Sequence, residues 1–170
     1  LSRRGIDSWC LDHINIRRAY SHAPSERAVF VELPPEDYQP GDEDMCGLLC
    51  ASLYGTRDAA KNWEAELGGY LQQLGLQKGL ASPCLYSSVN GELCVAVHGD
   101  DMTCCGSRQD SEWLLAKMKE RYEVKEQMLG EDTDLKKTGA VLNRKIEWTK
   151  QGVWLEADPK HAEEVIRALN

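Results

Sequence analysis

Three short runs of β-forming residues follow one another within residues 85–105, and tight-turn sequences join them. The first junction is Asn90-Gly91, the strongest two-residue hairpin signal, and the second is Gly99-Asp100-Asp101. Turns this short can only join strands that are antiparallel neighbours in one sheet. The pattern therefore predicts an antiparallel meander with strands over residues 85–89, 93–98 and 102–105.

Two carboxylates stand at the second turn, Asp100 and Asp101. Acids at a turn between strands sit on a rigid support and face outward, which suits the oxygen ligands of a hard cation such as Mg²⁺. Gly and Asp are also ordinary turn residues, so a solvated turn explains the same pattern. The turn by itself leaves both interpretations open.

The rest of the chain mixes helices and strands. Residues 58–74 carry apolar side chains at three- and four-residue steps before Gly75, which predicts an amphipathic helix. Ser107 to Asp110 resemble a capping box and predict a helix that continues to about Tyr122. Further expected elements are strands over 10–16 and 28–33, loops over 36–44 and 130–138, an edge strand over 124–128, a hairpin of 141–149 with 153–156, and a helix after Asp158-Pro159. Without a regular βαβα rhythm, the fold class expected is α+β, an antiparallel sheet with helices on one face.

Composition limits the class of protein. The 170 residues suit one domain, or one large domain with a small appendage, and 42% hydrophobic residues suffice for a core. No apolar run is long enough to span a membrane, no signal peptide opens the chain, and a start at Leu1 suggests a piece of a longer protein. The net charge of −8 has the wrong sign for a free-standing nucleic-acid binder.

The cysteines and histidines form no recognisable metal or disulfide pattern. The seven cysteines are odd in number, and their spacings match neither a zinc site nor a disulfide framework, which favours a reducing interior, the cytoplasm or nucleus. No two of the four histidines, His13, His22, His98 and His161, stand at ligand spacing, so we interpret all four as structural or surface residues.

Three segments together resemble a known family. They are residues 14–23 (INIRRAYSHA), residues 52–63 (SLYGTRDAAKNW), and residues 81–86 (ASPCLY) followed by 97–102 (VHGDDM). In this order and spacing they resemble the reverse transcriptase, an RNA-directed DNA polymerase, of copia-type LTR retrotransposon polyproteins. The resemblance runs from about residue 10 to the end of the chain.

The resemblance implies a polymerase palm over residues 1–170, with a fingers-like insertion at about 24–56 and the start of a thumb at 140–170. It implies nucleotidyl transfer by two Mg²⁺ ions, with one activating the primer hydroxyl and the other holding the triphosphate. Implied partners are an RNA or DNA template-primer, a deoxynucleoside triphosphate, and integrase and RNase H domains of the same polyprotein. No membrane is implied.

The resemblance also assigns residues. Asp100 and Asp101 match the family's metal-binding acid pair, His98 stands where a Tyr is usual, and Gly99 takes the variable place. Tyr20 matches the aromatic residue that excludes a ribose 2′-hydroxyl, and the Ile16 carbonyl matches a further metal ligand. Tyr54 and Gly55 match the segment against the nucleotide and template, and the nearby cations Arg57 and Lys61 receive no role.

One position departs from the family. Asn15 stands where the family has the Asp that bridges both metals, and a neutral amide oxygen is a far poorer ligand for a hard dication. Asp12 cannot replace it without a bulge, because strand residues three apart point to opposite faces. We therefore expect Asn15, Asp100 and Asp101 to converge as the catalytic group, with activity impaired.

Two alternatives stay open. The chain is either a non-enzymatic remnant of the fold, retained as a structural or interaction domain, or an unrelated acid-pair metal enzyme such as an RNA-dependent RNA polymerase or a nuclease. Tyr20 favours DNA synthesis over RNA synthesis, and residues 52–63 favour the copia family over the second alternative.

Overall fold

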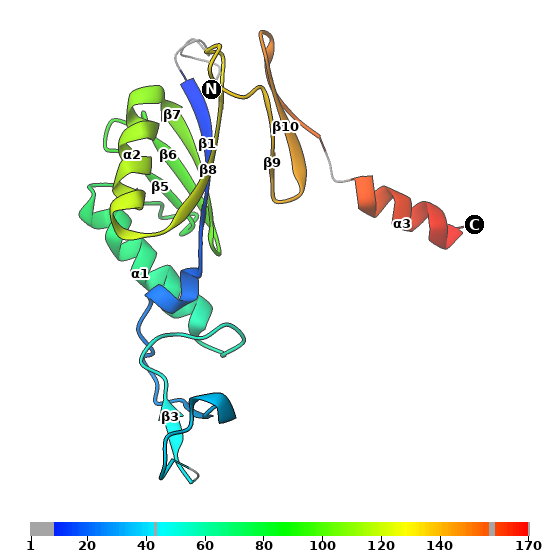
Figure 1. The fold of residues 1–170 in the computed structure, drawn as a ribbon. Helices are drawn as coiled ribbons and strands as arrows, with labels where there is room; N and C mark the ends of the chain where they lie inside the picture. The colour runs from blue at the N-terminus through cyan, green and yellow to red at the C-terminus, as the bar shows by residue number, and fades with distance from the viewer. Residues whose placement is uncertain (1–8, 43, 157–158, 170) are drawn as a thin grey trace.

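The computed structural model describes residues 9–42, 44–156 and 159–169 (Figure 1). Its elements in chain order are β1 (Trp9–Ile16), the 3-10 helix η2 (Ala19–His22), β2 (Phe30–Glu32), the 3-10 helix η3 (Pro35–Asp37), β3 (Cys46–Leu48), α1 (Ala59–Gln73), β4 (Gln77–Lys78), β5 (Leu85–Ser87), β6 (Cys94–His98), β7 (Asp101–Ser107), α2 (Arg108–Arg121), β8 (Val124–Gly130), β9 (Thr138–Val141), β10 (Arg144–Thr149), β11 (Gly152–Leu155) and α3 (Pro159–Leu169).

The main sheet has six strands in the order β4-β5-β6-β7-β1-β8, and every neighbouring pair in it is antiparallel. A three-stranded sheet, β11-β10-β9, and a two-stranded sheet, β2-β3, complete the described strands. Helices α1 and α2 both lie on one side of the main sheet (Figure 1). The predicted α+β class, with an antiparallel sheet and helices on one face, is confirmed.

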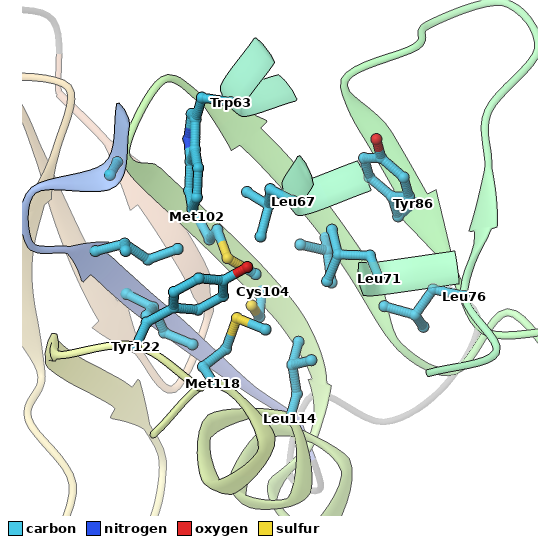
Figure 2. Close-up of a cluster of buried hydrophobic side chains, with 14 of the residues drawn as sticks. Trp63, Leu67, Leu71, Leu76, Tyr86, Met102, Cys104, Leu114, Met118 and Tyr122 are labelled. Atoms are coloured by element: carbon cyan, nitrogen blue, oxygen red, sulfur yellow. The ribbon is translucent and has the colours of Figure 1, made fainter. Parts of the chain in front are cut away.

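The core fills the space between the main sheet and these two helices (Figure 2). Burial alternates along β1, so that its even-numbered residues are buried and its odd-numbered residues are partly exposed on the other face. β7 follows the same alternation, with Met102 and Cys104 inside. Helix α1 contributes Trp63, Leu67 and Leu71 to the core, and helix α2 contributes Leu114 and Met118. The period-two burial fixes which side chains of β1 and β7 reach the outer face.

A second, smaller cluster covers part of that outer face. Leu129 of β8 packs with Ile146 and Trp148 of β10, and Trp9 and Leu11 of β1 lie against them. The small sheet β9–β11 therefore covers the beginning of β1. The end of β1 that carries Asn15 lies outside this cluster.

Helix α2 begins as predicted, and helix α1 ends as predicted. The Ser107 hydroxyl caps α2 by accepting a hydrogen bond from the Asp110 backbone N–H at 3.1 Å. Gly75 follows α1 with φ of 90°, the left-handed conformation that ends many helices. Asp58 precedes α1 without a side-chain capping hydrogen bond.

Two predicted strand boundaries are wrong. The β5–β6 pairing ends at Ser87 and Cys94, so Asn90-Gly91 lies within a longer loop in which the Ser88 hydroxyl accepts hydrogen bonds from the backbone N–H groups of Glu92 and Leu93. The predicted strand over 141–149 starts only at Arg144, as β10, because Val141 ends a separate strand, β9, and the chain turns at Leu142 and Asn143 with φ of 50° and 62°. Both positions adopt the left-handed conformation, in which Asn is common and Leu is rare, so the sequence at Leu142 does not indicate a turn.

Short elements that the sequence did not predict include β3, β4, β9 and the 3-10 helices η2 and η3. Helix η3 lies partly inside the predicted loop over 36–44. The loop between β8 and β9 is held by Lys137, whose ammonium donates to the carbonyl groups of Gly130 and Asp132 at 2.7 and 2.9 Å. The last predicted helix is present as α3, and its expected N-cap, Asp158, lies outside the described residues.

Candidate functional site

The acidic turn joins β6 to β7 as predicted. His98 pairs with Asp101 across the hairpin, and Gly99 and Asp100 form the turn between them. Gly99 has φ of 62°, which suits glycine because it has no Cβ. The indole N–H of Trp63 donates to the Gly99 carbonyl at 2.8 Å. Helix α1 thus fixes the turn through a buried aromatic side chain.

The sheet register brings Asn15 to the acid pair. Asn15 of β1 is the Cα partner of Asp101 in the β1–β7 ladder, and the Ile16 N–H donates to the Asp100 carbonyl at 2.9 Å. The Asn15 side-chain Nδ2 donates to Asp100 Oδ2 at 3.1 Å and to Asp101 Oδ1 at 2.9 Å. Asn15 therefore forms one hydrogen-bonded group with Asp100 and Asp101, which lie 85 and 86 residues further along the chain.

Asp12 takes no part in this group. Its side chain lies on the helix-covered face and is 0% exposed, whereas Asn15 is partly exposed on the outer face. The structure agrees with the sequence argument that these two positions point to opposite sides of β1.

Two further side chains reach the same part of the outer face. His13 lies two residues before Asn15, and its Nε2 is 3.5 Å from Asp101 Oδ1. Lys125 of β8 is the Cα partner of Asn15 on the other side of β1, and it is exposed. The sequence predicts His13 as a structural or surface residue, and it indicates no role for Lys125. The period-two spacing from Asn15 is the signal that points to His13, whereas Lys125 needs the strand order.

The residues assigned to the nucleotide side lie at the junction of η2 and the segment before α1. Tyr20 is half-buried in η2, and its ring stacks on the exposed ring of Tyr54 with centroids 4.3 Å apart and planes 29° apart. Gly55 follows with φ of 87°. The Ile16 side chain is fully buried in the core.

A cavity of about 260 Å³ lies beside the acidic turn. Tyr20, Trp63, Tyr86, His98 and Gly99 line part of it. Because Tyr20 lines this cavity together with His98 and Gly99, it lies beside the hairpin that carries the acids.

The cations Arg57 and Lys61, to which the resemblance assigns no role, follow Tyr54 and Gly55 closely in the chain. Lys61 forms an ion pair with Glu26 at 3.8 Å, and Arg57 is exposed.

The donor set limits the metal chemistry available here. It offers two carboxylates, a neutral amide that donates to both of them, and one imidazole. Within the described part of the chain, no group of three or more His, Cys, Asp or Glu side chains is arranged to hold a metal ion. Two Mg²⁺ ions need several anionic oxygens, so this arrangement is a poor match to such a pair.

The fold and this site define an α+β domain whose acidic β-hairpin lies beside a neighbouring strand of the same sheet. Residues 4–142 match the family model of the reverse transcriptase (RNA-dependent DNA polymerase), and the chain belongs to this family. It is also similar to the retrovirus-related Pol polyprotein from transposon TNT 1-94 of Nicotiana tabacum, with 26% identity over 168 residues. That match covers 94% of this chain and 12% of the relative, so the chain spans about an eighth of the length of that polyprotein. The predicted resemblance to a copia-type retrotransposon reverse transcriptase is confirmed.

None of the helices in the described ranges is long and apolar enough to cross a membrane.

Proposed function

We propose that this chain is the palm of a retrotransposon reverse transcriptase in which nucleotidyl transfer is impaired by Asn15. The observation that carries the proposal is the pair of hydrogen bonds from Asn15 Nδ2 to Asp100 and Asp101. In a palm of this family, an Asp at position 15 would place three carboxylates together, and cations would offset their repulsion. Here an amide takes the position of one carboxylate and satisfies the other two without a cation.

The energetic consequence concerns metal binding. A divalent ion that enters between Asp100 and Asp101 must displace two hydrogen bonds, and it gains one negative charge fewer than in a three-carboxylate site. Both effects weaken binding. Within this proposal, Tyr20, Tyr54, Gly55 and the Ile16 carbonyl line the nucleotide site, and Tyr20 excludes a ribose 2′-hydroxyl.

Domain roles and partners follow from the same proposal. Residues 24–56 serve as a fingers-like insertion, and residues 140–170 begin the thumb. The partners are an RNA or DNA template-primer, a deoxynucleoside triphosphate, and integrase and RNase H domains of the same polyprotein.

The first test is metal-dependent stability of the variant Asn15→Asp. Without divalent ions, this variant should have a lower melting temperature than the native chain, because three carboxylates then repel one another. Mg²⁺ should raise the melting temperature of Asn15→Asp and bind it about tenfold or more tightly than the native chain, since one added charge near an ion is worth at least about 1.4 kcal/mol. Asn143→Asp, the same change at an exposed turn, is the matched control and should show no Mg²⁺ response.

The second test is primer extension by a longer polyprotein segment that contains this chain. The segment with Asn15 should extend a primed RNA template weakly or not at all in Mg²⁺, and Asn15→Asp should restore extension. Efficient extension with Asn15 in place would overturn the proposed impairment.

A non-catalytic role is the second candidate. The same hydrogen bonds favour it, because Asn15 satisfies the carboxylates of Asp100 and Asp101 and the fold then needs no metal ion at this position. In that case the domain serves as a structural or interaction module. If Asn15→Asp binds Mg²⁺ but remains inactive in the longer segment, further lesions are present and this second candidate holds.

A further inference from the structure

Two cysteines face each other directly across the β6–β7 hairpin. Cys94 and Cys105 are Cα partners in the antiparallel register, so their side chains lie on the same face of the sheet. Directly opposite Cα atoms in such a ladder are about 4.5 or 5.5 Å apart, and disulfides join Cα atoms about 4.4–6.8 Å apart. The register therefore places the two sulfur atoms within reach of a covalent bond without a change of topology.

The surroundings of the pair make one thiol accessible and the other protected. Cys94 is exposed and Cys105 is partly buried, and both are free thiols. The adjacent Cys104 points into the core on the opposite face, where it is 0% exposed, so it does not compete for Cys94. Three residue pairs, 95–104, 96–103 and 97–102, separate the cysteines from the His98–Asp101 pair at the acidic turn.

We propose that Cys94 and Cys105 form a reversible cross-strand disulfide that locks the hairpin carrying Asp100 and Asp101. The oxidant is a small-molecule disulfide such as oxidised glutathione. The Cys94 thiolate attacks one of its sulfur atoms, which forms a mixed disulfide and releases one glutathione thiolate. The Cys105 thiolate then attacks the Cys94 sulfur and releases the second. Two protein thiols are oxidised to one disulfide, and the two electrons and two protons leave on two glutathione molecules.

Strain makes this bond easy to reduce. The Cβ atoms of directly opposite strand residues are about 4.5–5.5 Å apart, whereas a disulfide draws them to about 3.5–4.5 Å. Strained, exposed disulfides have more oxidising potentials than structural ones and behave as labile, regulatory bonds. The bond therefore forms under oxidising conditions and is removed by the thiols of a reducing interior.

The closure step has its own pH dependence. Burial, followed by the neighbouring thiols of Cys94 and Cys10, raises the pKa of Cys105 to about 11. Because only the thiolate attacks, closure of the mixed disulfide should accelerate about tenfold per pH unit between about pH 7 and 9.

The test uses the full chain with the other exposed cysteines, Cys46, Cys50 and Cys84, replaced by serine. After oxidised glutathione is added, mass spectrometry should show a mixed disulfide first and then a species two hydrogen atoms lighter than the reduced chain. Peptide mapping should join Cys94 to Cys105, and the melting temperature should rise and return to its original value on reduction. Hydrogen exchange of the hairpin amides should slow in the oxidised form.

Single variants separate the steps. Cys105→Ser should stop at the mixed disulfide, and Cys94→Ser should take up little glutathione and show no rise in melting temperature. A disulfide that maps to Cys104, or a chain that ends with glutathione on both Cys94 and Cys105, would overturn the proposal. None of these readouts depends on metal binding or polymerase activity, so the result stands apart from the proposed function.

Discussion

Asp12 is a carboxylic acid buried in the core. Its side chain is 0% exposed on β1, and neither carboxylate oxygen has a hydrogen-bond partner among the described residues. Burial, assisted by the negative charge of Glu126 and opposed by Lys119, raises the pKa of Asp12 from 3.8 to about 6. The folded protein therefore holds this proton more tightly than the unfolded chain does.

The raised pKa of Asp12 gives stability a definite pH dependence. The raised pKa of Asp12 lowers the free energy of unfolding very little below about pH 4. The loss of stability grows between about pH 4 and pH 6, and it stays constant above about pH 6. At pH 7.5, Asp12→Asn should raise the free energy of unfolding by about 1–3 kcal/mol, because Asn removes the charge but keeps an unpaired polar group. Urea unfolding at pH 4 and pH 7.5 measures this difference, which should vanish at pH 4.

The exposed Asp44→Asn is the matched control for Asp12→Asn and should show no such change between the two pH values. An equal gain for Asp12→Asn at both pH values would mean that burial of the charge is not the cause.

Individual residues of β1 differ in how well their place in the site can be predicted from the sequence. Alternation along β1 was enough to separate Asp12 from Asn15, because period-two geometry needs only one strand. The same alternation points to His13, yet a scattered histidine carries no ligand spacing by which to find it. The contact with Asp101 exists only because β1 pairs with β7 in one register.

At the scale of an element, helix α1 contains two adjacent glycines with different surroundings. A Cβ on Gly68 would lie 2.6 Å from the hydroxyl oxygen of Tyr86, which is buried, whereas a Cβ on Gly69 would meet no atom within 4 Å. Gly69→Ala should stabilise the protein by about 0.5–1 kcal/mol through helix propensity alone. Gly68→Ala gains the same propensity but must displace Tyr86, which costs about 1–3 kcal/mol.

Chemical denaturation of the two variants should therefore show opposite signs. Adding Tyr86→Phe to Gly68→Ala removes the clashing oxygen and should recover most of the loss. Equal stabilities for Gly68→Ala and Gly69→Ala would show that Tyr86 moves aside without cost.

Elements with strong local signals were predicted well. The amphipathic period gives α1, the Ser107 cap gives the start of α2, and the acidic turn gives the β6–β7 hairpin. The errors fall where side-chain contacts outweigh turn propensity, as at the Ser88 hydroxyl that lengthens the Asn90-Gly91 loop. They also fall where a strand has only two or three residues, as in β4 and β3, because no periodicity can develop over that length.

At the scale of the whole molecule, the strand order is the part that local patterns do not specify. The placement of β1 between β7 and β8 joins segments that are far apart in the chain, and it creates the group of Asn15, Asp100 and Asp101. Only the resemblance to a family supplied that expectation before the structure did. Local propensity and turn chemistry act within a few residues, whereas this pairing depends on the packing of the entire core.

The C-terminal helix α3 contributes little to the stability of the rest of the molecule. Every described side chain from Lys160 to Leu169 is exposed, and Figure 1 shows α3 standing away from the main sheet. Its apolar residues include Ile166 and Leu169, which are 58% and 82% exposed. A helix of 11 residues whose described side chains are all exposed is only marginally stable in water.

Truncation after Glu156 should therefore change the free energy of unfolding, measured with urea, by no more than about 0.5 kcal/mol. The helical circular dichroism signal should fall. Trp148→Ala is the contrasting change, because Trp148 is only 5% exposed in the cluster with Leu129 and Ile146. It should cost about 3 kcal/mol, since it leaves a cavity between β10 and the main sheet. A large loss on truncation would show that α3 packs on the domain in solution, and its apolar face would then be the surface that makes the contact.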